Sequence, residues 1–366
     1  SLVVVFATAE HARDDATLAA VRDALDPEHL IGCSTEATVG GGTEAEGEAA
    51  VSVWAASLPG ADIRSFRLQT HPVGDGIGVG GWPDAVDGRT EHPWTVLLLA
   101  DPFTFPADGL LARINEESDT PPRVLGGMAS GGSQPGDHRV MIGADSHADG
   151  AVAVAIAGVP IVPVVSQGCA PVGPEMVITD AEESAIRRLA GDPALEKIEA
   201  VVRDLDDEER ALAVKGLLAG LVIDENRPQY ERGDFLIRAL HGGDRESGEV
   251  RVGERVRVGQ TMRLHARDAA SASEDMRRAL LSARPFMPHG DPGGALLFTC
   301  NGRGTRLFDD AHHDAGAVAG HMGAPATAGM FCNGEIGPVG GRNFLHGFTA
   351  TLALFAGGDG DDTGAW

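Results

Sequence analysis

Two stretches, ALLFTCNGRG at 295–304 and ATAGMFCNGEIGP at 326–338, each place a Cys-Asn-Gly turn after an apolar run. Because Asn-Gly tolerates left-handed backbone, we expect a strand to end sharply at each turn. The first turn then presents Arg303 and the second presents Glu335. Polar side chains at strand ends beside flexible loops are typical of small-molecule sites.

A third glycine-rich loop, GGRN at 340–343, follows, and residues 344–355 predict a closing strand that carries His346. A guanidinium can grip a carboxylate with two hydrogen bonds, and a carboxylate or an amide can hold an ammonium group. In the alternative interpretation, Arg303 and Glu335 pair with each other and only pin the two turns. The predicted ligand-binding residues lie in or near these turns: Cys300, Asn301, Arg303, Cys332, Asn333, Glu335, Asn343 and His346.

One order of elements recurs along the chain. An apolar run at 2–6, a helical pattern to about residue 25 and a second apolar run at 30–33 are followed by a similar succession at 95–127, and the stretch at 295–331 is the third. Such strand–helix–strand–strand units bury one helix face against one sheet face. We therefore predict a mixed α+β fold of two face-to-face mixed sheets with helices outside, a four-layer sandwich. Two side-by-side α/β domains are the alternative.

The middle of the chain has a different pattern. Residues 180–230 are rich in charge and predict helices, residues 235–265 predict a hairpin-rich sheet, and 269–283 predict a helix. We place a domain boundary in this region, which gives an N-terminal domain at 1–180 and a C-terminal domain at 181–356. The glycine- and aspartate-rich tail at 357–366 is expected to be disordered.

Five motifs, in order, resemble the FIST domain family: LIGCST at 30–35, LGGMASGG at 125–132, SQGCAPVGP at 166–174, the segment 235–276, and the two Cys-Asn-Gly turns with the sequence after them. The first three are similar to motifs of the FIST N-terminal region and the others to the C-terminal region. This resemblance implies a sensory role in signal transduction, with amino acids or their derivatives as ligands. The chain shows no kinase, cyclase, methyl-accepting or F-box segment, so we expect a separate signalling protein, or a change of oligomer, to carry the output.

Composition limits the partners. The net charge of −25 argues against nucleic acid and against an anionic membrane surface. No run of about 18 apolar residues predicts a membrane span, and the opening SLVVVFATAE resembles a strand and not a signal peptide. These features favour a cytoplasmic protein.

Two other kinds of site were weighed against ligand binding. The four cysteines are far apart in sequence and predict free, mostly buried thiols, although a nucleophilic Cys300 or Cys332 with His346 as its base would make a cysteine-dependent enzyme. Asp309, Asp310, His312, His313, Asp314 and His321 could in principle hold a metal, but acidic residues before a helix more often cap it. We therefore expect no metal, no cofactor and no catalysis. A protein-interaction module whose motif residues only stabilise turns is the third alternative.

Overall fold

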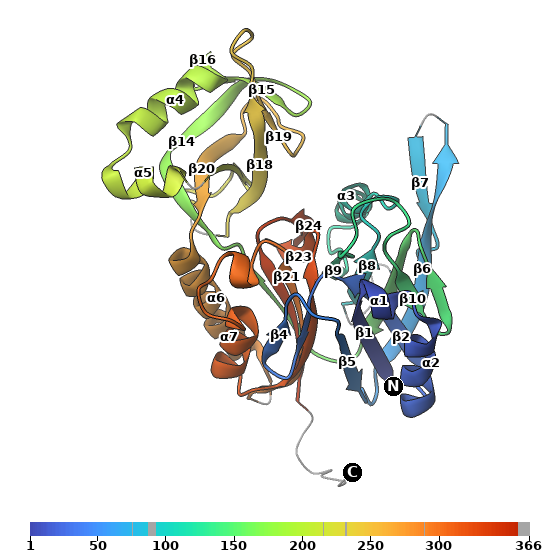
Figure 1. Ribbon diagram of the computed structural model, residues 1–366. Coiled ribbons are helices and arrows are strands. Elements are labelled where there is room, and N and C mark those ends of the chain that lie inside the picture. The colour runs from blue at the N-terminus through green and yellow to red at the C-terminus, as the bar shows by residue number, and fades with distance from the viewer. Residues whose placement is uncertain (75, 87–92, 215, 231–232, 289, 358–366) are drawn as a thin grey trace. The chain divides into compact units, whose positions relative to one another are not determined.

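The computed structural model describes residues 1–74, 76–86, 93–214, 216–230, 233–288 and 290–357 (Figure 1). The chain forms two compact units, and neither is continuous in sequence. The first unit contains Ser1–Val165, Met276–Leu345 and Thr349–Trp366, and the second contains Ser166–Asp275 and His346–Phe348. The predicted boundary at residue 180 falls inside the strand Cys169–Glu182. The tail predicted to be disordered lies outside the described residues, except for Gly357.

The first unit contains three sheets. Their strand orders are β11-β10-β2-β1-β5, β24-β23-β9-β8-β12-β6-β7 and β13-β25-β21-β22-β3-β4. The strands are β1 (Leu2–Thr8), β2 (His29–Thr35), β3 (Thr38–Gly40), β4 (Thr43–Ala45), β5 (Val51–Ala56), β6 (Asp62–Val73), β7 (Gly76–Gly80), β8 (Thr95–Ala100), β9 (Arg123–Met128), β10 (Val140–Ile142), β11 (Asp145–His147), β12 (Ala151–Ala157), β13 (Ile161–Ser166), β21 (Pro292–Cys300), β22 (Ala326–Cys332), β23 (Glu335–Val339), β24 (Arg342–His346) and β25 (Ala350–Ala356).

Each sheet of the first unit contains a parallel strand pair, formed by the two strands that flank the helix of one repeated unit. The pairs are β1 with β2, β8 with β9, and β21 with β22, and Cys300 lies opposite Cys332 in the third. A helix connects the two strands of each pair, as parallel pairing requires. These helices are α2 (Asp15–Leu25), which follows the short α1 (Ala9–Ala12), then α3 (Ala107–Glu117) and α7 (His313–His321).

One hydrophobic core receives side chains from all three sheets, including Phe6, Leu97, Leu125, Phe298 and Met330. The other faces of these strands pack against helices. Residues of α3 pack against β8, β9 and β12, and residues of α6 (Ala269–Ala283) and α7 pack against β21, β22 and β25 (Figure 1). The mixed α+β class is thus confirmed, but the predicted four-layer sandwich is not, because three sheets share the central core.

The second unit is built around a seven-stranded sheet of order β14-β20-β17-β18-β19-β15-β16, in which an additional β14–β15 pairing closes the ring in a barrel-like way. Its strands are β14 (Cys169–Glu182), β15 (Ala185–Leu189), β16 (Asp192–Pro193), β17 (Leu217–Val222), β18 (Phe235–Gly243), β19 (Val250–Val252) and β20 (Thr261–Arg267), and its helices are α4 (Ala194–Asp204) and α5 (Asp207–Ala213).

Three sequence predictions need correction. The region 180–230 is not all helical, because β15 and β17 are strands whose apolar residues complete the ring. The single closing strand predicted at 344–355 is two strands, β24 and β25. The helix expected after the acidic cluster is present as α7, but the expected cap is not, because the side chain of the N-cap residue His312 makes no cap hydrogen bond. The Glu44 carboxylate, from β4, instead accepts a hydrogen bond of 2.9 Å from the Ala315 backbone N–H.

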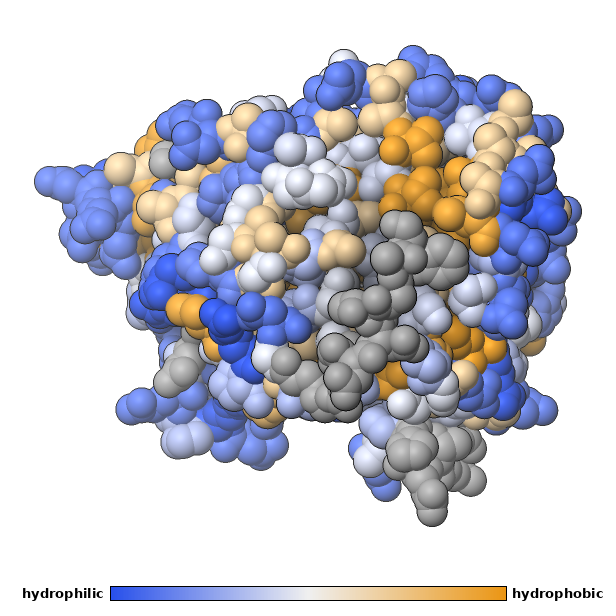
Figure 2. All heavy atoms as spheres, turned by 90° about the horizontal axis from the view of Figure 1, so that it is seen from below, coloured by the Kyte–Doolittle hydropathy of each residue, from blue (hydrophilic) through white to orange (hydrophobic). Residues whose placement is uncertain are grey.

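The surface agrees with the acidic composition. In the view of Figure 2, hydrophilic residues cover much of the surface and hydrophobic residues form smaller groups between them. No helix among the described residues is both long enough and apolar enough to cross a membrane.

Candidate functional site

The carboxyl ends of four strands from the first unit meet at one place. Main-chain hydrogen bonds join the two Cys-Asn-Gly turns to each other and to the end of β9. Asn301 N donates to Cys332 O at 2.9 Å, Asn333 N donates to Met128 O at 3.1 Å, and Met128 N donates to Gly334 O at 2.8 Å. Ser130, just after β9, accepts a hydrogen bond of 2.9 Å from the N–H of Glu36, just after β2. Turns from three copies of the repeated unit are therefore fixed side by side, at the sheet edge where ligands commonly bind.

A polar pocket of about 560 Å³ opens at these strand ends. Both Cys-Asn-Gly turns contribute an asparagine to it, and the remaining residues come from the N-terminal part of the chain. The lining residues are Arg13, Glu36, Ser130, Gly131, Gly132, Ser133, Asp137, Asn301 and Asn333. The volume suits a small metabolite.

Charges of both signs line the pocket. The Arg13 guanidinium donates to the Asp137 carbonyl at 2.7 Å and lies 3.5 Å from its carboxylate. The N–H groups of Ser133 and Gln134 donate to that carboxylate and lower the pKa of Asp137. Glu36 forms an ion pair with Arg306. The pocket thus offers a cation and two carboxylates that are already held in place.

A fully buried ion pair lies within the first Cys-Asn-Gly turn and the helix that follows it. Arg303 donates from Nε and Nη2 to the two carboxylate oxygens of Asp314, at 2.7 and 2.8 Å. Thr299 and His313 also bond to that carboxylate, at 2.6 and 2.9 Å. Burial alone would raise the pKa of Asp314, but the charge and hydrogen bonds of Arg303 hold it well below its usual range.

Glu335 bonds to Thr349 and forms no ion pair with Arg303, the partner considered in the sequence analysis. Its Oε2 accepts hydrogen bonds from the N–H and the hydroxyl of Thr349, at 3.1 and 2.7 Å. Burial raises the pKa of Glu335 to about 8, against the opposing effects of Thr349, Arg303 and Cys300. Among the described residues no ion pair joins Arg303 to Glu335, so mutual pairing does not explain these two turns.

Three polar atoms of the two turns have no hydrogen-bond partner within the described part of the chain. They are Arg303 Nη1, Glu335 Oε1 and Asn301 Oδ1. Buried polar atoms are rarely left unpaired, because each one costs the free energy of its lost hydration. Of these three residues only Asn301 lines the polar pocket, so its Oδ1 indicates a place there for a bound hydrogen-bond donor.

The two turn cysteines differ in burial. Cys332 is fully buried, with its Sγ against Gly127, and burial raises the pKa of its thiol well above the usual value. Cys300 is half-buried, and the Gly302 N–H approaches its Sγ at 3.5 Å. Cys300 therefore has the greater access to reagents.

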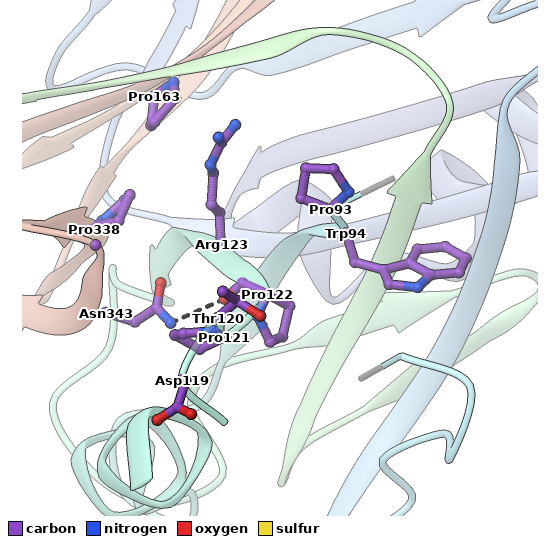
Figure 3. Close-up of a pocket in the computed structure, with 11 residues that line it drawn as sticks. Pro93, Trp94, Asp119, Thr120, Pro121, Pro122, Arg123, Pro163, Pro338 and Asn343 are labelled. Atoms are coloured by element: carbon purple, nitrogen blue, oxygen red, sulfur yellow. Dashed lines mark hydrogen bonds between the residues drawn. The ribbon is translucent and has the colours of Figure 1, made fainter. Parts of the chain in front are cut away.

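Two predicted residues lie away from the strand-end pocket. Asn343 bonds to α3 and to the start of β9. Its backbone N–H donates to Asn115 Oδ1 at 2.8 Å, its Oδ1 accepts from Val124 N at 2.8 Å, and its Nδ2 donates to Pro122 O at 2.9 Å. It lines a second pocket of about 560 Å³ that is rich in proline (Figure 3). His346 is buried and belongs to the second unit. Of the eight predicted residues, only Asn301 and Asn333 line the polar pocket.

A buried histidine–aspartate pair at the same sheet edge was not predicted. His138 Nδ1 lies 3.0 Å from Asp101 Oδ1, just after β8, and both side chains are buried. Its Nε2 has no partner among the residues described, and it would lie 3.0 Å from a Cβ placed on the pocket residue Gly132. From the sequence, only Asp101 could have been noticed, as an aspartate at a strand end. His138 follows a loop whose path the sequence does not reveal.

No group of three or more His, Cys, Asp or Glu residues in the described ranges is arranged to hold a metal ion. Asp314 is bound by Arg303, and the N-cap residue of α7, His312, makes no side-chain cap hydrogen bond, so the cap that the sequence indicated is not formed by its N-cap residue.

Comparison with known proteins identifies the family. The FIST N domain matches residues 1–192, and the FIST C domain matches residues 194–338. An uncharacterized protein of Mycobacterium bovis is 42% identical over 357 residues, which cover 97% of this chain and 90% of that protein. An uncharacterized protein of Mycobacterium tuberculosis is 42% identical over 339 residues, covering 92% of this chain and 86% of that protein. FIST domains are generally sensory domains of signal transduction. The chain belongs to the FIST family, with both its N and C domains.

Proposed function

We propose that this protein is a sensor that binds a small amino-acid-like ligand in the polar pocket at the strand ends. The observation that carries the proposal is the pocket itself: about 560 Å³, lined by Arg13, Glu36 and Asp137 together with two asparagines. An amino acid needs a cation for its carboxylate and acceptors for its ammonium group. The pocket contains both.

Each end of such a ligand has a partner in the proposed arrangement. The carboxylate would lie against Arg13 and the backbone of Gly131 and Gly132. The ammonium group would donate to Asn301 Oδ1, which has no partner among the described residues, and would face Glu36. Because Arg303 is fully buried and bound to Asp314, it supports the turn and does not contact the ligand in this proposal.

Binding would draw together segments from three copies of the repeated unit, because Arg13 follows α1 and the other pocket residues follow β2, β9, β21 and β22. A ligand that bridges these loops would make them more ordered and less mobile, and a separate signalling protein could bind the two states with different affinity. We propose such a protein, or a change of oligomer, as the recipient of the signal.

Calorimetry against an amino-acid panel tests the proposal, with the matching amines and carboxylic acids as partial ligands. Asn301→Ala and Asn333→Ala should each weaken binding by about tenfold, which is the loss of one hydrogen bond to a charged group. Asn226→Ala is the matched control, since Asn226 is exposed in the second unit. Absence of saturable binding by the whole panel, or equal affinity in all three variants, would disprove the proposal.

A further inference from the structure

The proline-rich pocket of the first unit takes no part in the sensing proposed above. Its volume is about 560 Å³, and it shares no lining residue with the polar pocket. Five prolines and Trp94 supply its apolar wall, and Arg123 and Asp119 are its charged residues. An apolar wall with a few polar groups is typical of sites for small organic ligands.

The wall of this pocket is held by the chain's own hydrogen bonds. Asn343, from the glycine-rich loop at 340–343, donates from Nδ2 to Pro122 O at 2.9 Å and accepts from Val124 N at 2.8 Å. These bonds fix the backbone on both sides of Arg123, whose own N–H donates to Trp94 O at 2.9 Å. The proline rings add rigidity because each fixes its φ angle. A wall that needs no reordering favours binding, since less conformational entropy is lost.

Arg123 brings to this pocket a positive charge that no carboxylate of the described residues neutralises. Its side chain is exposed and, in the view of Figure 3, extends between Pro163 and Pro93. Its Nη1 donates to the Ile161 carbonyl at 3.4 Å, and it forms no ion pair within the described part of the chain. The chain has 54 acidic side chains against 29 lysines and arginines, so acids are not scarce. The guanidinium is therefore available to an anion from outside the protein.

The second charge of the pocket limits the kind of anion. Asp119 is exposed in the same wall and would repel a dianion, such as a phosphate monoester, more strongly than a singly charged group. A carboxylate carries one charge and matches a guanidinium with two parallel hydrogen bonds. Flat aromatic rings suit the rest of the wall, because they gain dispersion energy against the CH groups of the proline rings.

We propose that the proline-rich pocket binds a small aromatic carboxylate, with the ring among the proline side chains and the carboxylate on Arg123. The volume is sufficient for a ligand of one or two rings. The proposal does not rest on the amino-acid-like ligand of the polar pocket, because the two pockets have no residue in common.

Calorimetry on the full chain tests the proposal with indole-3-acetate as the probe. Indole-3-acetamide has the same ring without the charge, and acetate has the same charge without the ring. Indole-3-acetate should bind saturably, and each of the other two compounds should bind at least about tenfold more weakly, because each lacks one of the two interactions.

Three variants locate the probe. Arg123→Met should weaken the binding of indole-3-acetate about tenfold and leave that of indole-3-acetamide unchanged, since only the charged contact is lost. Arg22→Met is the matched control, because Arg22 is exposed on α2 and does not line the pocket. Asn301→Ala, in the polar pocket, should also bind indole-3-acetate like the parent protein.

The proposal is overturned if indole-3-acetate does not bind saturably, or if the acid and the amide bind the parent protein with equal affinity. Unchanged affinity for indole-3-acetate in Arg123→Met also overturns it. Weaker binding in Asn301→Ala would place the probe in the polar pocket and overturn it as well. The comparison of acid and amide needs no variant, so the test holds even if Arg123→Met does not fold.

Discussion

Glu335 provides the sharpest physical test, because a buried carboxylic acid with a raised pKa makes stability depend on pH. Burial is the main cause that raises the pKa of Glu335 from its usual value of 4.5 to about 8. Between these values the folded protein keeps a proton that the unfolded chain releases. The contribution of Glu335 to the free energy of unfolding is therefore fully present below about pH 4.5 and is lost as the pH rises toward 8.

The magnitude follows from the same shift. At about 1.36 kcal/mol per pKa unit, Glu335 would withdraw up to about 5 kcal/mol of stability across this range. Glu335→Gln removes the titration but keeps an oxygen that can accept both hydrogen bonds from Thr349. The variant should match the parent protein within about 1 kcal/mol at pH 5 and exceed it by about 2–4 kcal/mol at pH 8.5.

Urea unfolding of both proteins from pH 5 to pH 9 measures this difference directly. Glu116→Gln is the matched control, since Glu116 is exposed on α3, and its curve should follow the parent protein throughout. Parallel curves for Glu335→Gln and the parent, or a variant that is the less stable protein at pH 8.5, would refute the reasoning.

Two other substitutions test the turns around this residue. Arg303→Met leaves Asp314 buried without its charge partner and should lower the free energy of unfolding in urea by about 3–5 kcal/mol. Adding Asp314→Leu should recover part of that stability. A smaller loss of stability in Arg303→Met than in the double variant would contradict the ion-pair assignment. Gly126→Ala should cost about 3 kcal/mol or more, because Gly126 has a φ of +142° and its new Cβ would lie 2.0 Å from Leu98 O. In the control Gly41→Ala, the new Cβ would have no atom within 4 Å, and the free energy of unfolding should fall by only about 1–2 kcal/mol. Similar thermal midpoints for the two variants would contradict this account of Gly126.

Local pattern was enough to predict the strands and turns of the repeated unit. The runs before Cys300 and Cys332 are strands that end at those residues, because apolar sequence followed by Asn-Gly constrains both the strand and its end. The helix at 269–283 was predicted for the same reason. Repetition of the order of elements also indicated three strand–helix–strand units, and in each of them the structure pairs the two strands in parallel.

The partners of the turn residues could not be predicted in this way. Arg303 pairs with Asp314, which the sequence suggested as a helix cap, because the intervening loop returns the first turn of α7 to the end of β21. Glu335 meets Thr349 because β23 and β25, which belong to different sheets, pack close together. Seven of the nine residues that line the pocket precede the Cys-Asn-Gly turns by more than 160 positions, and Arg13 and Glu36 precede them by more than 260. Those contacts depend on how separate copies pack, which no local pattern specifies.

The structure separates the charges that stabilise the turns from the charges that can select a ligand. Arg303 and Asp314 neutralise each other, and Glu335 is mostly protonated at neutral pH because its pKa is about 8. The buried part of the site therefore carries almost no net charge, which limits the desolvation cost of placing three ionisable groups inside the protein. In the proposed sensor, Arg13, Glu36 and Asp137, which line the pocket, would recognise the ligand's charges, so exchanging one of these charges should change ligand preference with little loss of stability. Changes at Arg303 or Asp314 should do the reverse, because those residues hold the loops on which the pocket depends.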